Sequence, residues 1–202
     1  MKVIGLTGGI GMGKSTAAAA FRRAGIPVFD ADAAVHKLQA RGGRALPAIA
    51  RVFPGTVRDG VLDRASLRAI VLADRAAMRR LEAILHPLVR HAQHRFLALA
   101  RGRGVPMAVL DVPLLFETGG NKRVDHVVVV SAPASVQRQR VRRRRRMTEA
   151  QISAMIALQM PDAVKRARAD TVVRTGLSRF HAVAAIERFI ARERAGSRKA
   201  RQ

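Results

Sequence analysis

A run of eight residues near the start of the chain has the types and spacing of a phosphate-binding loop. The run is Gly8-Gly9-Ile10-Gly11-Met12-Gly13-Lys14-Ser15, which matches G-x-x-x-x-G-K-[S/T] in full. Glycines let the backbone approach phosphate oxygens, and successive N–H groups at a helix N-terminus attract anions. Lys14 would meet the β- and γ-phosphates, and Ser15 would offer its hydroxyl to Mg²⁺. A glycine-rich turn with an incidental lysine is the weaker alternative, because a strand pattern precedes the loop and a helix pattern follows it.

Acidic residues stand where two apolar runs end. Asp111 closes the run over residues 107–112, the Walker-B position of a carboxylate near Mg²⁺. Alone it would equally suit an Asp that caps the turn before Pro113. Asp30 and Asp32 close the second run, where ligands bind in open α/β sheets, and a carboxylate there can accept the proton of an attacking hydroxyl. Capping of a helix over residues 33–40 is the simpler alternative role for Asp32.

Arginines crowd a helix expected over residues 134–146, which includes five in a row. Arginines on a closing lid can stabilise the charge of a transferring phosphoryl group and exclude water. Arg140 and Arg144 share a helix face at i,i+4. For most of the arginines a solvated basic face is the simpler interpretation. His86, His91 and His94 have no acidic partner within a turn, so surface or packing roles are favoured over metal ligation.

The elements that must position these residues alternate between strands and helices. Strands are expected over residues 2–6, 28–30, 107–112, 126–131 and 171–173, mostly without alternation, so both faces should be buried. Helices are expected over residues 16–24, 64–72, 75–85, 87–100 (opened by Pro87), 134–146, 148–160 (opened by a capping box) and 177–194. The pattern predicts a doubly wound, five-stranded parallel sheet in one α/β domain over residues 1–202. Residues 31–106 are expected to form an inserted helical subdomain, 134–160 a lid, and 195–202 a disordered tail.

Composition limits the function classes. The 202 residues include no Cys, which excludes disulfides, Cys-ligated metals and cysteine nucleophiles, and no apolar run is long enough to span a membrane. The net charge of +24 suits polyanionic partners. Aromatic residues make up only 3%, with no Trp or Tyr, so platforms for stacking nucleic-acid bases are nearly absent. Drift towards Ala and Arg would also explain the charge.

Several motifs in order resemble the dephospho-coenzyme A kinase family. They are the opening through Thr16, Asp30-Ala31-Asp32, Leu85-His86-Pro87, Pro113-Leu114-Leu115-Phe116-Glu117, a lid helix, Gln159-Met160 and Ala169-Asp170. The resemblance reaches about Gly176. It implies ATP-dependent phosphorylation of the ribose 3′-hydroxyl of dephospho-CoA, the last step of coenzyme A synthesis, in the cytoplasm.

The resemblance also implies site roles. Asp32 would act as the general base, and Lys14 and Arg140 as further catalytic groups. ATP would contact Gly8, Gly9, Gly11, Met12, Gly13, Lys14, Ser15, Thr16 and Arg144; dephospho-CoA would contact Asp32, His86, Pro113, Leu114 and Glu117; Mg²⁺ would contact Ser15 and Asp111.

Three positions depart from the family pattern. Met12 replaces the usual Ser, at a position that acts mainly through its backbone N–H. Arg145 and Arg146 stand where the lid usually carries Gly or an acidic residue, and Thr175-Gly176 stands where an Asn often follows the last strand.

Two alternatives stay open. The first is another small-molecule P-loop kinase of the nucleoside monophosphate kinase type, which the 113–117 motif argues against. The second is a basic nucleic-acid-binding P-loop protein, which leaves the loop unexplained. No specific nucleic acid and no membrane partner are expected, and the protein is expected to be a monomer or a weak homo-oligomer.

Overall fold

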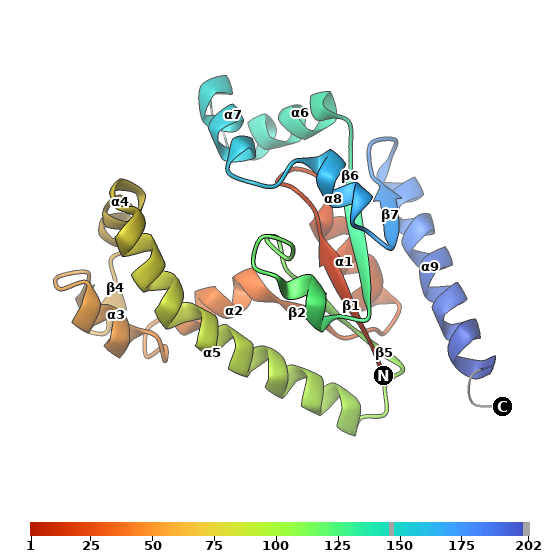
Figure 1. Ribbon diagram of the computed structural model, residues 1–202, viewed down its shortest axis with the longest axis horizontal. Helices are drawn as coiled ribbons and strands as arrows, with labels where there is room; N and C mark the ends of the chain where they lie inside the picture. Colours follow the sequence, from red (N-terminus) through yellow and green to blue (C-terminus); the bar gives the residue numbers. More distant parts are fainter. Residues whose placement is uncertain (146–147, 200–202) are drawn as a thin grey trace. The chain divides into compact units, whose positions relative to one another are not determined.

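The computed structural model describes residues 1–145 and 148–199, without the side chains of residues 144, 145 and 197–199 (Figure 1). The elements are β1 (Lys2–Thr7), α1 (Lys14–Arg23), β2 (Val28–Asp30), α2 (Ala31–Leu38), α3 (Leu46–Val52), β3 (Val57–Arg58), β4 (Val61–Leu62), α4 (Arg64–Ala73), α5 (Arg75–Gly102), β5 (Met107–Asp111), the 3₁₀ helix η1 (Gly120–Arg123), β6 (His126–Ser131), α6 (Ala134–Arg145), α7 (Glu149–Ala157), α8 (Asp162–Ala167), β7 (Thr171–Arg174) and α9 (Arg179–Lys199). They divide into two compact units, Asp30–Leu99 and the rest of the chain.

The larger unit is built on a five-stranded sheet with the order β2-β5-β1-β6-β7. The central strand β1 pairs in parallel with β5 and with β6, which pairs in parallel with β7. Lys2 lies opposite Met107, and Ile4 lies opposite His126. The predicted five-stranded parallel sheet is confirmed, and its connections place the carboxyl ends of the strands along one edge.

Both faces of the central strands β1, β5 and β6 are buried, as the lack of alternation in these strands predicted, whereas the edge strand β7 has exposed residues. Strand β6 shows this most clearly, because Val128 and Val130 belong to a core shared with Phe21 of α1 and Ile186 of α9. Val127 and Val129 pack instead with Leu115 and Phe116, which follow β5. A strand buried on two sides needs apolar residues at successive positions, which is why the valines run without interruption.

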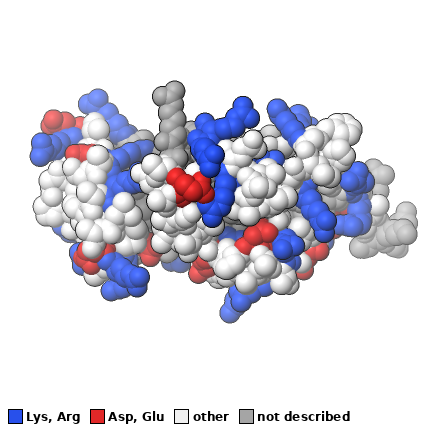
Figure 2. Space-filling view, turned by 90° about the horizontal axis from the view of Figure 1, so that it is seen from above, with Lys and Arg blue, Asp and Glu red and all other residues white. Residues whose placement is uncertain are grey.

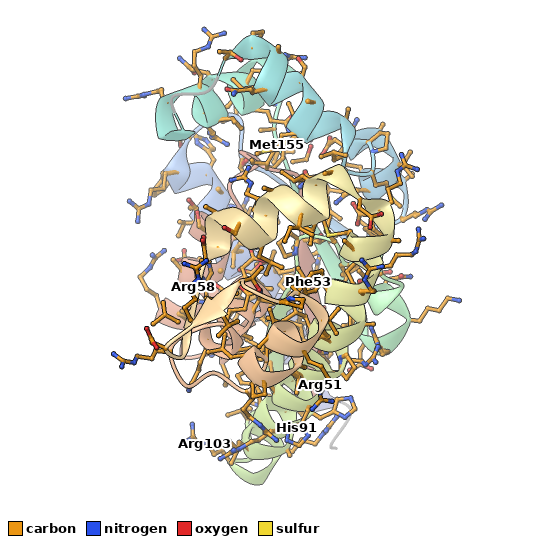
Figure 3. The ribbon with its side chains drawn as sticks, turned by 90° about the vertical axis from the view of Figure 1, so that its left-hand side faces the viewer. Arg51, Phe53, Arg58, His91, Arg103 and Met155 are labelled. Carbon is orange, nitrogen blue, oxygen red and sulfur yellow. The ribbon has the colours of Figure 1, made fainter. Side chains whose placement is uncertain are left out.

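The smaller unit has a core of its own. Residues of α3, α4 and the first half of α5 gather around buried side chains such as Ile49, Leu67 and Phe53, the last of which is labelled in Figure 3. The unit also contains the β3–β4 hairpin, which the sequence analysis did not predict. Its turn is Asp59-Gly60, with φ of 49° and 72°. An Asp-Gly pair between short apolar segments is a recognised hairpin signal, and it was the evidence that could have predicted these strands.

Residues 75–102 form one helix, α5, so the expected break before Pro87 is wrong. Proline inside a helix removes one N–H and frees the carbonyl of the residue four positions earlier, here Ala83. Pro87 and Ala83 are both exposed, so water can satisfy that carbonyl. Length and the packing of the apolar face then keep the helix continuous.

Smaller differences lie near the C-terminus. The helix expected over residues 148–160 ends at Ala157 and is followed by the separate helix α8, although its Thr148–Gln151 capping box is present as predicted. Residues 195–199, expected to be disordered, continue helix α9, and residues 200–202 lie outside the described part. Within the described residues, no helix has the length and apolar character needed to cross a membrane.

Candidate active site

The loop between β1 and α1 has the backbone conformation that its glycines permit. Gly13 caps the N-terminus of α1 in the left-handed region, with φ of 89°, and Gly11 has φ of 75°. A Cβ at Gly11 would lie 2.9 Å from the carbonyl oxygen of Gln137, and one at Gly13 would lie 3.1 Å from the hydroxyl of Thr175. Glycine is therefore required at both positions by conformation and by space.

Met12 is a core residue as well as a loop residue. Its side chain is buried in the cluster that contains α1 and β6, and its Sδ accepts a hydrogen bond of 3.1 Å from the backbone N–H of Ala132. Its carbonyl accepts a hydrogen bond of 2.7 Å from the hydroxyl of Thr175. The Met12 side chain is therefore part of the core, and the expected role of its backbone N–H stays a prediction.

Lys14 and Asp111, predicted from separate parts of the sequence, meet in the structure. The Nζ of Lys14 lies 2.5 Å from Oδ1 of Asp111, and both side chains are largely shielded from solvent. Ser15 is next to Lys14 in the first turn of α1 and is exposed. The structure therefore brings together a lysine that can bind phosphate, a buried carboxylate at the end of β5 and, one residue along the chain, a hydroxyl.

Arg140 extends from α6 to the phosphate loop. Its guanidinium donates to the carbonyl of Gly11 at 3.4 Å, and to the hydroxyl and carbonyl oxygens of Thr175 at 3.2 and 2.6 Å. Thr175 is buried and also bonds Met12, so it connects the segment after β7 with both the loop and α6. Sequence reasoning noted Thr175 only as a departure from the family pattern and did not assign it a contact.

The remaining arginines of α6 divide by their contacts. Arg138 and Arg142 both pair with Glu149 at the start of α7, and these charges lower the pKa of Glu149. These two pairs join α6 to the start of α7. The backbone of Arg144 belongs to α6, but its side chain, expected to contact ATP, lies outside the described part.

Two glutamine side chains reach the loop at Ile10. Gln159, which follows α7, accepts a hydrogen bond from the Ile10 N–H, and Gln137 of α6 donates one to the Ile10 carbonyl, both at 2.9 Å. Gln159 was noted only as part of a family motif, and Gln137 was not singled out. Their roles depend on a contact across more than a hundred residues of chain, for which local spacing gives no signal.

Glu117 is held by an ion pair with a buried lysine. The Nζ of Lys165, which is fully buried, lies 2.9 Å from Oε1 of Glu117 and 3.2 Å from the carbonyl of Pro113. The Met160 N–H also donates to Glu117, at 3.0 Å. Burial acts to raise the pKa of Glu117, but these hydrogen bonds outweigh it and hold the pKa below its ordinary value. The contacts give Glu117 a positioning role for the segment after β5.

In the smaller unit, the cap of helix α2 is Asp30 and not Asp32. Asp30 accepts the N–H of Ala33, while Asp32 stands exposed in the first turn. Within the described residues, no hydrogen bond or ion pair involves the Asp32 side chain. The simpler role considered for Asp32 is therefore taken by its neighbour. His86 lies on the exposed side of α5, and Leu114, of the larger unit, is also exposed.

A cavity of about 640 Å³ opens beside the phosphate loop in the larger unit. Its walls come from the loop, the end of β6, α6, α8 and the segment after β7, and include Met12, Ser131, Gln137, Asp162, Arg174 and Gly176. Backbone groups, an amide, a carboxylate and a guanidinium around one cavity suit a polar, planar ligand.

These features define a class of protein. A glycine loop at a helix N-terminus, with a lysine paired to the carboxylate of the neighbouring strand and an arginine from a following helix, is the arrangement of P-loop phosphotransferases. Comparison with solved structures supports the fold of this chain. A shikimate kinase from Acinetobacter baumannii shares the fold, with a TM-score of 0.53 at 16% identity over 94% of this chain and 91% of that one.

The chain belongs to the dephospho-CoA kinase family, whose model matches residues 2–178. Among curated relatives, the dephospho-CoA kinase of Mesorhizobium japonicum is 58% identical over 87% of this chain and 88% of its own, and that of Gluconobacter oxydans is 51% identical over 98% and 100%. The crystal structure of TT1252 from Thermus thermophilus superposes with a TM-score of 0.83 at 35% identity, covering 95% of this chain and 97% of that one. The family resemblance read from the sequence is confirmed.

Proposed function

We propose that the protein transfers the γ-phosphoryl group of ATP to the ribose 3′-hydroxyl of dephospho-CoA, which completes coenzyme A. The observation that carries this proposal is the family match over residues 2–178, which includes the phosphate loop and the whole smaller unit. A nucleoside monophosphate kinase and a nucleic-acid-binding protein are not favoured, because neither accounts for a match of that extent. We place the reaction in the cytoplasm, where ATP is abundant.

The nucleotide half of the reaction uses the loop. The N–H groups of residues 11–15 would bind the phosphates of ATP, with Gly8, Gly9 and Thr16 as further contacts of the same segment. Lys14 would leave Asp111 for the β- and γ-phosphates, because a triphosphate offers a higher density of negative charge than one carboxylate. We assign the base to the cavity beside Met12, where Arg174 and Gly176 form part of the wall.

The donor set suits Mg²⁺ bound together with nucleotide. Mg²⁺ takes few protein ligands beside phosphates and water, and the Ser15 hydroxyl and the Asp111 carboxylate are hard oxygen donors of that kind. Within the described residues, no group of three or more acidic or histidine side chains could hold a metal by itself. When bound, the ion would neutralise charge on the phosphates. Asp111 would then exchange Lys14 for the ion.

Arg140 would act on the transferring group. Its guanidinium lies 3.4 Å from the Gly11 carbonyl of the phosphate loop, and this proximity supports the assignment. A cation there stabilises the charge that spreads over the equatorial oxygens during transfer. Arg144, one turn further along α6, is proposed as a second contact.

The acceptor half of the reaction is assigned to Asp32. A carboxylate without a protein partner can orient the ribose hydroxyl and accept its proton as the phosphoryl group is transferred. Asp32 follows β2, which neighbours β5 in the sheet, so its strand ends at the same edge as Asp111. We assign His86, Pro113 and Leu114 to binding of dephospho-CoA, with Glu117 supporting the 113–117 segment.

One assay tests the activity. Purified protein with Mg-ATP should convert dephospho-CoA to CoA, detected by chromatography, while adenylate, shikimate and gluconate remain poor acceptors at the same concentration. Folding is checked by circular dichroism. Turnover of adenylate in preference to dephospho-CoA would support the nucleoside monophosphate kinase alternative, and no turnover of dephospho-CoA by folded protein would overturn the proposal.

A further inference from the structure

The Ile10 backbone is bonded on both of its polar groups by side chains from the lid segment. Gln159 accepts from its N–H and Gln137 donates to its carbonyl, each at 2.9 Å. Gln137 lies near the start of α6 and Gln159 follows the end of α7, so the two glutamines stand on either side of the α6–α7 segment (Figure 1). Both ends of that segment are therefore attached to a single residue of the phosphate loop.

Gly9 provides the space for this arrangement. A Cβ at Gly9 would lie 3.3 Å from Nε2 of Gln137 and 3.3 Å from Oε1 of Gln159, closer than side chains ordinarily approach. Both side-chain amides thus pack against the backbone at Gly9, where the loop has no side chain. The absence of a side chain at Gly9 makes room for the two glutamines, in addition to any phosphate.

The burial of Gln137 indicates that its contact contributes to the fold of the loop. Only 6% of its surface is exposed, and a buried amide is costly unless its polar atoms are bonded. The two glutamines also take opposite parts in their hydrogen bonds, because Gln159 accepts and Gln137 donates. A side chain that can only accept could therefore replace Gln159 but not Gln137.

We infer that Gln137 and Gln159 are positioning residues for the ATP phosphates, which hold the loop through Ile10 in its anion-receiving conformation. With the N–H and carbonyl of Ile10 both engaged, the segment before Gly11 cannot rotate without breaking a hydrogen bond. The N–H groups that follow are then pre-organised for phosphate, and ATP binding does not have to order them. The expected effect on kcat/KM for ATP rests on the proposed function. The expected effect on the loop around Ile10 rests on the geometry alone.

The test uses three substitutions of the same type in the full-length chain. Gln137→Met and Gln159→Met keep the side-chain length and remove the hydrogen bond. Gln139→Met is the matched control, because Gln139 is exposed on the same helix and its side chain makes no hydrogen bond within the described residues. The readouts are the exchange rate of the Ile10 amide proton by NMR, the affinity for Mg-ADP, and kcat and KM for both substrates.

Gln159→Met should expose the Ile10 amide and speed its exchange at least tenfold, since its acceptor is gone. Either of the two variants should weaken Mg-ADP binding about fivefold and lower kcat/KM for ATP about tenfold, the size of effect expected from one lost hydrogen bond and a looser loop. KM for dephospho-CoA should stay within twofold. The double variant should lose less than the product of the single losses, because both bonds act through Ile10.

A charge substitution separates acceptor from donor. Gln159→Glu still accepts from the Ile10 N–H and should keep its slow exchange, whereas Gln137→Glu cannot donate at neutral pH and should weaken Mg-ADP binding more than Gln137→Met does. These outcomes depend on the direction of each hydrogen bond, which a general packing role would not reproduce.

Two results would overturn the inference. One is an Ile10 amide that exchanges in Gln159→Met as slowly as in Gln139→Met. The other is faster exchange with unchanged Mg-ADP affinity and unchanged kcat/KM for ATP, which would make the contacts purely structural. If the unsubstituted protein fails to phosphorylate dephospho-CoA, the proposed function fails, while amide exchange and Mg-ADP binding still decide the role of the glutamines.

Discussion

Two neighbouring aspartates at the end of β2 have different environments. The Asp30 carboxylate accepts a hydrogen bond from the N–H of Ala33, which stabilises the start of α2. The Asp32 side chain is exposed and has no partner in the described part of the chain. Helix capping requires a side chain at the residue before the first turn, and only Asp30 occupies that position. Capping of α2 therefore accounts for Asp30, and the proposed chemistry is assigned to Asp32.

Substitution of the exposed aspartate should separate binding from catalysis. Asp32→Asn removes the proton acceptor with little change in shape, so kcat should fall about 100-fold or more while Mg-ATP affinity stays within twofold. Steady-state kinetics and nucleotide titration measure the two quantities. Asp59→Asn, in the hairpin turn of the same unit, is the control and should leave both unchanged. Near-normal turnover in Asp32→Asn would remove Asp32 from the chemistry.

Lys14 should contribute to Mg-ATP binding and turnover and, in the free protein, should pair with Asp111. Lys14→Ala removes the charge that meets the phosphates and leaves Asp111 buried without its 2.5 Å partner. We expect affinity for Mg-ATP and kcat each to fall at least tenfold, the size of effect expected when a charge-assisted contact of about 1.5–3 kcal/mol is lost. Titration and kinetics measure this, with exposed Lys122→Ala as the control. A mild phenotype would count against the assignment of the loop.

At the scale of elements, the segments after β5 and after α7 are joined by one ion pair whose lysine is fully buried. Lys165 of α8 meets Glu117 and the Pro113 carbonyl, and the Met160 N–H meets the same Glu117. Pro113 is also bonded by the hydroxyl of Thr7, where β1 ends. The ends of β1 and β5 and the segment after α7 are therefore fixed relative to one another by a few polar contacts.

Removal of one partner of this pair should destabilise the fold. Glu117→Gln leaves the fully buried ammonium of Lys165 without its counter-charge, which should lower the free energy of unfolding by about 2 kcal/mol. Urea denaturation measures the change, and exposed Glu187→Gln is the control, expected within about 0.5 kcal/mol of the parent. Lys165→Met in the Glu117→Gln background should recover part of the loss. Equal stability of Glu117→Gln and the parent would contradict this role for the pair.

The same pair should make stability depend on pH. Because the folded pKa of Glu117 lies below its ordinary value of 4.5, the folded state binds fewer protons there than the unfolded state. Its stabilisation is complete above pH 4.5 and is lost as pH falls through the folded pKa. The difference in unfolding free energy between the parent and Glu117→Gln should therefore shrink between about pH 5 and pH 3. A constant difference over that range would rule out the carboxylate as its source.

For the whole molecule, the basic side chains that give the net charge of +24 are spread over the surface as well as placed at the phosphate loop. Figure 2 shows Lys and Arg side chains across the visible face with few acidic ones among them. The contacts described above use only a few cations, namely Lys14, Arg140 and Lys165, and two more arginines pair with Glu149. Lys2, Arg80 and Arg166 also pair with carboxylates. Because the net charge of +24 already subtracts every carboxylate, a large positive excess remains that can act at long range on anionic substrates.

Salt should slow substrate capture more than chemistry. An increase in ionic strength from about 0.05 M to about 0.3 M should lower kcat/KM for ATP and dephospho-CoA about fivefold and leave kcat within twofold, since screening weakens long-range attraction. Stopped-flow or steady-state kinetics measure this, and sucrose of equal osmolarity serves as the control. If kcat/KM is indifferent to salt, the surface charge plays no part in capture.

Local sequence by itself determined the five strands, the phosphate loop and the capping box, because each depends on residues within about ten positions of one another. It also placed Lys14 and Asp111 at one edge, since parallel strands end together. The tertiary structure alone decided that Asp30 caps α2, that Pro87 leaves α5 unbroken, and that Thr175, Gln137 and Gln159 bond the phosphate loop. The contacts of Thr175, Gln137 and Gln159 join segments more than a hundred residues apart. They depend on how helices pack against the sheet, which the spacing of residues within one segment does not specify. The cap of α2 and the continuity of α5 are local, but several start positions suit the same sequence, and the packing of each helix selects one of them.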